Sequence, residues 1–107
     1  MTESVAASQA LILRFGELAI DLDEYRVSMS GRRIILSYRE YALLVYLAGR
    51  AGQTVSKRRL LEEGLGRHDI GGLRVVDEHL RHLKGLLERE GCSCVHADGD
   101  AGWRFAV

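Results

Sequence analysis

Charged side chains recur at helical spacing in the segment RVVDEHLRHLKGLLERE, residues 74–90. Arginine and lysine on such a helix could bind DNA, because both donate hydrogen bonds to guanine and to phosphate oxygens. The acids of the same segment oppose that chemistry. Its bases and acids cancel, namely Arg74, Arg81, Lys84 and Arg89 against Asp77, Glu78, Glu88 and Glu90. The helix could therefore face DNA or another protein.

Catalytic and metal chemistry are less well supported. No nucleophile, base and orienting group occur in a recognisable set, and Asp98 and Asp100 resemble turn acids, so the sequence does not predict an enzyme. Cys92, Cys94 and His96 alternate and could share one strand face as metal ligands, but a structural zinc site needs a fourth ligand. Half-buried strand residues are favoured, and no metal or cofactor is predicted.

The chain has 107 residues, the size of one domain, with 15 basic and 15 acidic residues. We expect residues 1–10 to form a flexible lead-in and residues 11–107 to form the domain. No apolar run approaches the ~20 residues that span a bilayer, and the N-terminus lacks the features of a secretory signal. These observations favour a cytoplasmic protein with no membrane partner.

The pattern of the sequence changes from short strands to helices near Leu36. Residues 11–36 alternate like short strands, with Ser30-Gly31 as a turn, and predict a small antiparallel sheet in which Tyr25, Val27 and Met29 share one face. Ser37 with Glu40 three residues later is a capping box, which predicts a helix that ends at Gly49 or Gly52.

Two more helices and a hairpin follow. Ser56 is a candidate N-cap for a second helix that stops at Gly64 or Gly66. A third helix over about 73–90, ended by Gly91, is predicted by an apolar stripe at spacings of three and four: Leu73, Val76, Leu80, Leu83 and Leu87. The tail predicts two strands around ADGDAG. This order is the α+β plan of a winged helix-turn-helix.

Three fragments resemble the OmpR/PhoB-type DNA-binding effector domain of response regulators. They are SGRRIILSYREYALLVYLAGRAGQTVSKRRLL, LRVVDEHLRHLKGLLE and GWRF, in the order and spacing of that family. The resemblance covers the chain from about Leu13 to its end. It implies a four-stranded N-terminal sheet, three helices and a C-terminal hairpin wing, with double-stranded DNA as the partner.

The resemblance also implies how the parts are used. The third helix enters the major groove and the wing reaches the minor groove, while the loop at about 64–72 contacts RNA polymerase and a homodimer binds direct repeats. The residues expected at DNA are those of the second helix start, the third helix and the wing: Lys57, Arg58, Arg59, Arg74, Glu78, Arg81, His82, Lys84 and Arg104.

Some positions depart from the family pattern. Glu78, His82 and Gly85 replace residues that are usually neutral or basic in that family. In the wing, the basic residue that enters the minor groove would fall at Gly99, which Asp98 and Asp100 flank. Carboxylates in a narrow minor groove are repulsive, so that contact should be weak unless Arg104 provides it. The alternative function is therefore a winged helix repurposed for protein–protein interaction. Trp103 is expected to pack the hairpin onto the third helix.

Overall fold

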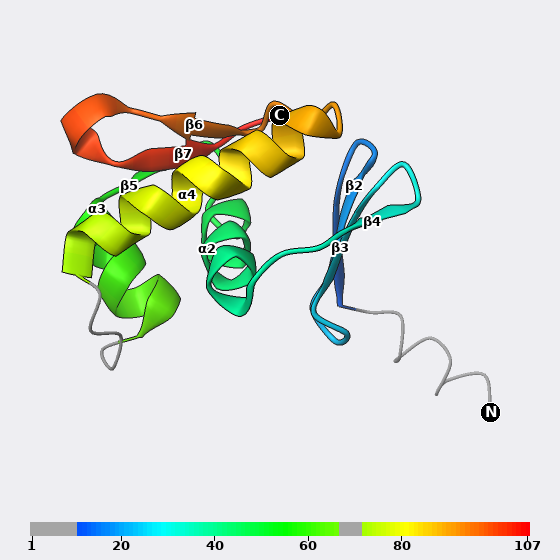
Figure 1. The fold of residues 1–107 in the computed structure, drawn as a ribbon, viewed down its shortest axis with the longest axis horizontal. Helices are drawn as coiled ribbons and strands as arrows, with labels where there is room; N and C mark the ends of the chain where they lie inside the picture. Colours follow the sequence, from blue (N-terminus) through cyan, green and yellow to red (C-terminus); the bar gives the residue numbers. More distant parts are fainter. Residues whose placement is uncertain (1–10, 67–71) are drawn as a thin grey trace. The chain divides into compact units, whose positions relative to one another are not determined.

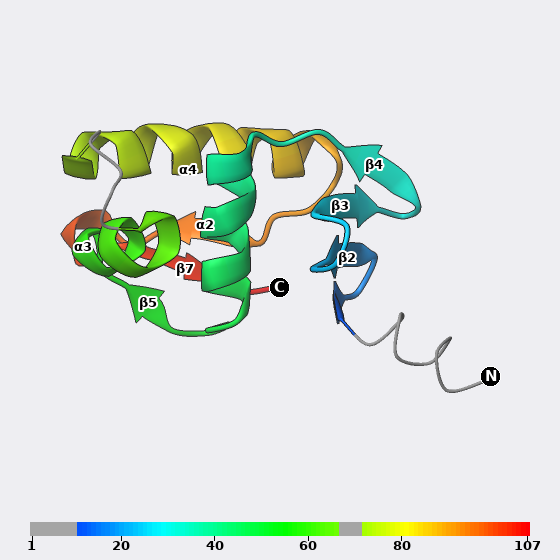
Figure 2. The ribbon, with the colours of Figure 1, turned by 90° about the horizontal axis from the view of Figure 1, so that it is seen from below.

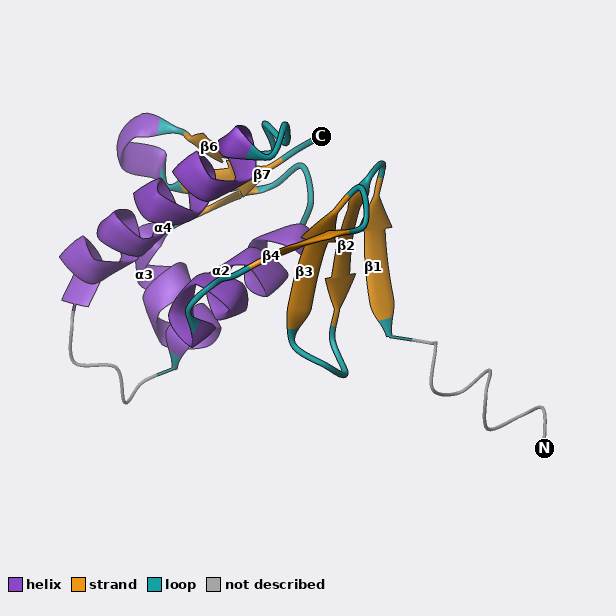
Figure 3. Cartoon of the chain, turned by 45° about the vertical axis from the view of Figure 1, so that its right-hand side comes forward, coloured by secondary structure: helices purple, strands orange, loops and turns teal. Residues whose placement is uncertain are grey.

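The structure is a computed structural model that describes residues 11–66 and 72–107. The chain forms two compact units, the first ending at Ile35 and the second running from Leu36 to Val107. A meander of strands makes up the first unit, and helices with a second small sheet make up the other (Figure 1, Figure 3). The element order is sheet, helices and hairpin, which confirms the predicted α+β winged-helix architecture.

The first unit is a four-stranded antiparallel sheet in which each strand pairs with the next. The strands are β1 (Ile12–Phe15), β2 (Leu18–Asp21), β3 (Arg26–Met29) and β4 (Arg32–Ile34). Apolar side chains of one face are buried, whereas the other face carries polar ones. The prediction of a small antiparallel sheet is confirmed.

The turns of this sheet follow from local chemistry, with one correction. Ser30 and Gly31 both have positive φ, 53° and 82°, which matches the twist of a tight hairpin between β3 and β4. Val27 and Met29 lie two residues apart on β3 and share one face as predicted, and Val27 is buried. Tyr25 does not share its face, because it lies in the preceding turn at φ 55° and is 66% exposed.

The helix α2 (Tyr38–Ala48) opens the second unit and begins where the sequence predicts. The Ser37 hydroxyl accepts from the Glu40 amide at 3.2 Å, and a Glu40 carboxylate oxygen accepts from the Ser37 amide at 3.1 Å. These two bonds form the capping box. Gly49 is the C-cap. Tyr41 is buried and Tyr38 is exposed, so only the first of this pair packs in the core.

The second helical segment starts at its predicted cap as an α-helix and continues as a wider π-helix. Ser56 accepts from the amide of Arg59 at 3.2 Å and caps α3 (Lys57–Arg59). The chain continues without a break into the π-helix η1 (Leu60–Leu65), which ends at Gly66. The start and the end were predicted, but the wider π geometry has no signature in the sequence.

The third helix, α4 (Gly72–Arg89), carries the predicted stripe with one exception. Its four central positions are fully buried: Val76, Leu80, Leu83 and Leu87. Leu73 was predicted with them but is 40% exposed, because it lies in the first turn, before the helix meets its neighbours. The end is as predicted: Gly91 has φ 91°, and the Cys92 amide turns back to the carbonyl of Leu87 at 2.9 Å.

A second sheet completes this unit in the order β5-β7-β6. The predicted hairpin is β6 (Val95–Ala97) and β7 (Trp103–Phe105), joined by the 3₁₀ turn η2 (Gly99–Ala101). The third strand, β5 (Thr54–Val55), was not predicted. The hairpin lies alongside α4 (Figure 1, Figure 2).

Candidate nucleic-acid interface

The exposed face of α4 carries Arg74, Glu78 and Arg81. Within the second unit, α2, α3 and β7 all lie on one side of α4 (Figure 2). Arg74 Nε lies 3.8 Å from Glu78 Oε2, and these side chains are 88% and 61% exposed, so the pair is a weak surface one. Arg81 is also exposed and makes no hydrogen bond or ion pair with another described residue. Its guanidinium is therefore available to a ligand on this face of α4.

His82 is predicted at DNA, but its ring also holds two helices together. Its Nδ1 contacts the Glu40 Oε2 of α2. Glu40 is only 4% exposed, and His79 Nδ1 lies 3.9 Å from the same oxygen. Burial acts to raise the pKa of Glu40, but the hydrogen bonds from His82 and Ser37 outweigh burial and leave that pKa below its usual value. A base contact by His82 would compete with this internal contact.

Lys57 is held at the start of α3 by Asp77 of α4. Its Nζ lies 2.9 Å from Asp77 Oδ2, while Trp103 Nε1 of the wing donates to Asp77 Oδ1 at 2.9 Å. Burial acts to raise the pKa of Asp77, but the bonds from Trp103 and Lys57 lower it overall. One carboxylate thus joins the third helix to the second helix and the wing.

Contacts with Lys57 and Trp103, rather than a position in the first helical turn, account for the acid at position 77. The helix starts at Gly72 and has no acid in its first turn, so the helix dipole does not explain Asp77. The predicted packing of Trp103 between hairpin and α4 is confirmed, because the indole is 3% exposed and bonds to that helix.

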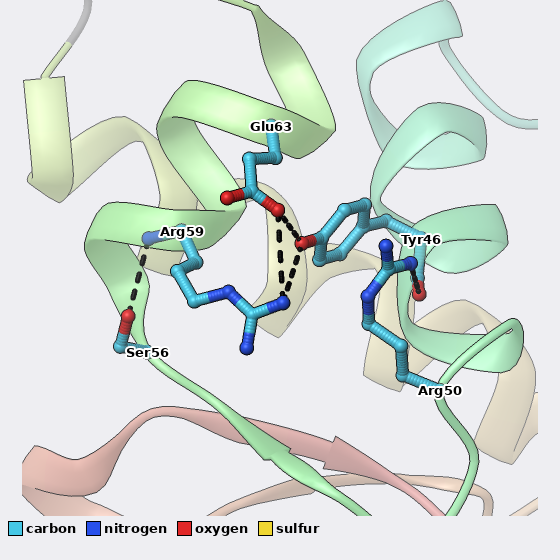
Figure 4. Close-up of polar contacts among 5 residues, drawn as sticks. All are labelled: Tyr46, Arg50, Ser56, Arg59 and Glu63. Carbon is cyan, nitrogen blue, oxygen red and sulfur yellow. Dashed lines mark hydrogen bonds and ion pairs between the residues drawn. The ribbon is translucent and has the colours of Figure 1, made fainter.

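Arg58 and Arg59 are exposed and each has a glutamate partner one helical turn later. Arg58 Nη1 lies 3.6 Å from Glu62 Oε2, and Arg59 Nη2 lies 3.6 Å from Glu63 Oε1. Arg59 also donates to the Tyr46 hydroxyl at 3.1 Å, and that hydroxyl donates to Glu63 (Figure 4). The hydrogen bond from Tyr46 is the main reason that the pKa of Glu63 is lowered.

A second arginine covers the ring of the same tyrosine. The guanidinium carbon of Arg50 lies 3.7 Å from the centroid of Tyr46, and its Nη1 donates to the Tyr46 carbonyl at 3.2 Å (Figure 4). This is a cation–π contact on top of a hydrogen bond. The tyrosine therefore orders one cation from the turn after α2 and one from α3, which the sequence did not indicate.

Lys84 and Arg104 are also paired within the domain. Lys84 Nζ lies 2.6 Å from Glu88 Oε2 on the last turns of α4. Arg104 Nε donates to Asp98 Oδ2 at 3.1 Å, and Thr54 Oγ1 donates to the same oxygen at 2.6 Å. The Thr54 and Arg104 bonds hold the pKa of Asp98 below its usual range. The wing thus binds the arginine expected in the minor groove to one of its own acids.

The predicted DNA-binding residues therefore lie on the helices and wing of the second unit, but most of them form ion pairs with acids of the same domain. Sequence reasoning missed the partners Glu40, Tyr46 and Thr54, of which only Glu40 had a local signal, the capping box. Residues 67–71 of the loop expected at RNA polymerase lie outside the described residues.

The cysteines precede the hairpin and do not alternate along β6, which corrects that expectation. Cys92 and Cys94 are buried free thiols with their sulfurs 2.7 Å apart, and burial raises the pKa of Cys94. His96 Nε2 lies 3.1 Å from the carbonyl oxygen of Ala106. In the described parts of the chain, no three His, Cys, Asp or Glu side chains are arranged to hold a metal ion, and no helix could span a membrane.

Comparison with known proteins decides the family. The family model described as "Transcriptional regulatory protein, C terminal" matches residues 31–105. The chain belongs to this family. The transcriptional regulatory protein SrrA of Staphylococcus aureus is 33% identical over 99 residues, which are 90% of this chain and 41% of SrrA. The chain thus spans less than half the length of that relative.

Solved structures of other members of the transcriptional regulatory family share the fold. The response regulator DrrB of Thermotoga maritima, an OmpR/PhoB homologue, is 26% identical with a TM-score of 0.79, over 99% of this chain and 49% of DrrB. The RstA DNA-binding domain of Klebsiella pneumoniae, in complex with the RstA box, is 28% identical with a TM-score of 0.76, over 89% of this chain and 96% of that domain. The chain is an OmpR/PhoB-type winged-helix domain of a transcriptional regulator.

Proposed function

We propose that this domain binds double-stranded DNA with α4 in the major groove and so regulates transcription. The observation that carries the proposal is the uncovered face of α4, where Arg81 is exposed and unpaired with any described residue. Family membership and the likeness to RstA, which is bound to the RstA box in its structure, support it. Arg81 is placed to donate to the N7 and O6 of a guanine.

Phosphate contacts would come from the start of α3. Arg58 and Arg59 lie on its first turn, beside backbone amides that also favour anions. Their glutamate partners are exposed, so exchanging a glutamate for a phosphate costs Arg58 little, whereas Arg59 would also leave the Tyr46 hydroxyl. Lys57 is more firmly held, because its partner Asp77 also binds Trp103.

The remaining sites are part of the same proposal. His82 and Lys84 would contact bases or phosphates after leaving Glu40 and Glu88, and Arg104 would reach the minor groove after leaving Asp98. Contact with RNA polymerase through residues 64–72 and binding as a homodimer to direct repeats rest on the family resemblance. So does the activity of the whole regulator, of which this chain would be the effector part.

A selection from random duplex DNA at low salt tests the function. The parent should enrich a motif, and Arg81→Glu should lose that motif. Arg33→Glu is the matched control, because it makes the same charge change at an exposed position of β4. If the parent enriches a motif that Arg81→Glu keeps, the domain recognises DNA without this arginine. If the parent enriches nothing, the domain has lost DNA recognition. The alternative function, a winged helix that binds another protein, would then take its place.

A further inference from the structure

Glu78 occupies an unusual place for an acid on a helix that faces DNA. It lies between Arg74 and Arg81 on the uncovered side of α4, and its side chain is 61% exposed. The neighbouring Asp77 is 18% exposed and faces Lys57 and Trp103 instead. Glu78 is therefore the carboxylate that the middle of α4 presents outward.

A carboxylate in the major groove distinguishes bases by what they can donate. It only accepts hydrogen bonds, and cytosine N4 offers a donor without an adjacent acceptor. Guanine presents two acceptors, thymine presents an acceptor and a methyl group, and adenine sets N7 beside its amino group. We propose that Glu78 selects cytosine at one position of the binding site, an inference that rests on the proposed DNA binding.

The neighbouring arginines make this contact feasible. Arg81, three residues later on the same face, would read a guanine near the cytosine. Arg74 lies 3.8 Å from Glu78 and offsets its charge against the phosphates, while the exposure of both leaves Glu78 free to turn toward a base. With a guanine, thymine or adenine at this position, the carboxylate meets an acceptor and binding weakens. Glu78 thus contributes discrimination more than affinity.

The substitution Glu78→Gln tests the assignment, because glutamine prefers adenine through paired contacts to N6 and N7. Selected motifs should show cytosine favoured about tenfold at one position for the parent, and adenine favoured there for Glu78→Gln, as expected for one good base contact. Glu88→Gln is the matched control: it removes the same charge from the same helix, at a residue paired with Lys84. It should leave the base preference unchanged.

The possible results are distinguishable. A motif that is identical for the parent and Glu78→Gln, with affinity raised equally for all sequences, overturns the assignment and leaves Glu78 as a repulsive charge only. A preference that changes equally in Glu88→Gln overturns it too. If the parent enriches no motif, the proposed DNA binding fails and the assignment falls with it. Thermal unfolding of each variant verifies that the fold is retained, as expected for exposed positions.

Discussion

Removing the Asp77 carboxylate should destabilise the second unit more than removing any exposed acid. In Asp77→Ala the indole N–H of Trp103, on a side chain 3% exposed, loses its acceptor at 2.9 Å. An unsatisfied buried donor costs about 1–3 kcal/mol. Lys57 also loses an ion pair at 2.9 Å whose side chains are 29% and 18% exposed, which adds up to about 1 kcal/mol. The expected loss is about 2–3 kcal/mol.

Urea unfolding followed by tryptophan fluorescence measures this loss, because Trp103 is the only tryptophan of the chain. A loss of 1 kcal/mol lowers the midpoint temperature of thermal unfolding by roughly 4 °C for a domain of this size, so the midpoint of Asp77→Ala should lie about 8–12 °C below that of the parent. Asp77→Asn should cost less than Asp77→Ala, since the amide oxygen still accepts from the indole. Glu62→Ala, which removes an exposed partner of Arg58, serves as the control and should cost under about 0.5 kcal/mol.

A double-mutant cycle with Trp103→Phe isolates the hydrogen bond from the ion pair; because Trp103→Phe removes the only tryptophan, urea unfolding of all four proteins is followed by circular dichroism. If the bond matters, the double variant Asp77→Ala, Trp103→Phe should be more stable than the sum of the single losses implies, by about 0.5–3 kcal/mol. An Asp77→Ala loss no greater than that of Glu62→Ala, or strict additivity in the cycle, would refute the reasoning. The tie between α4 and the wing would then rest on apolar packing of the indole alone.

Four further outcomes follow from the structure. Gly85→Ala should stabilise by about 0.5–1 kcal/mol in urea unfolding, because its added Cβ meets nothing within 4 Å and alanine favours a helix interior. Gly102→Ala should cost at least about 2 kcal/mol by the same assay, because its Cβ would lie 1.9 Å from the Val55 carbonyl oxygen at φ 132°. The pKa of Glu40 is lower in the folded protein than in the unfolded one, where it lies near 4.5, so the ionised carboxylate stabilises the fold fully above that value. This stabilisation is lost as pH falls through the folded pKa, and urea midpoints measured between pH 7 and 3 should therefore fall less for Glu40→Gln than for the parent. In titrations at several salt concentrations, DNA affinity should fall with log salt at a slope shallower than about −5, that of six phosphates.

The elements of the fold were predictable where their signals are local. The capping box of Ser37 and Glu40 fixes the start of α2 within four residues of sequence, and Ser56 does the same for α3. The spacing of apolar residues along α4 predicts which face of the helix is buried, because helical periodicity can be read from neighbouring residues alone. Leu73 was misassigned because the stripe continues into the first turn of α4, where this side chain is 40% exposed.

The features that were missed depend on distant residues. Strand β5 has two residues and exists through its pairing with β7, where Thr54 faces Arg104, about fifty positions away. No periodicity in so short a segment could indicate a strand. Part of the candidate site was missed in the same way, because the acids that hold Lys57 and His82 lie on other helices. His82 and Glu40 are separated by 42 residues, and the sequence contains no pattern that joins them.

The burial of these pairs divides the predicted cations into two kinds. Lys57 and Arg104 have side chains 29% and 34% exposed, and their acids also hold Trp103 and Thr54, so moving either cation to a phosphate disturbs a wing contact. Arg58 and Arg74 are 70% and 88% exposed with weakly held glutamates, so they can exchange partners at little cost. Because the released glutamates remain beside the phosphates, that exchange yields little net attraction. Under the proposed function, binding strength comes mainly from base contacts by Arg81 and its neighbours on α4, so a correct sequence should matter more to this domain than the charge of the duplex.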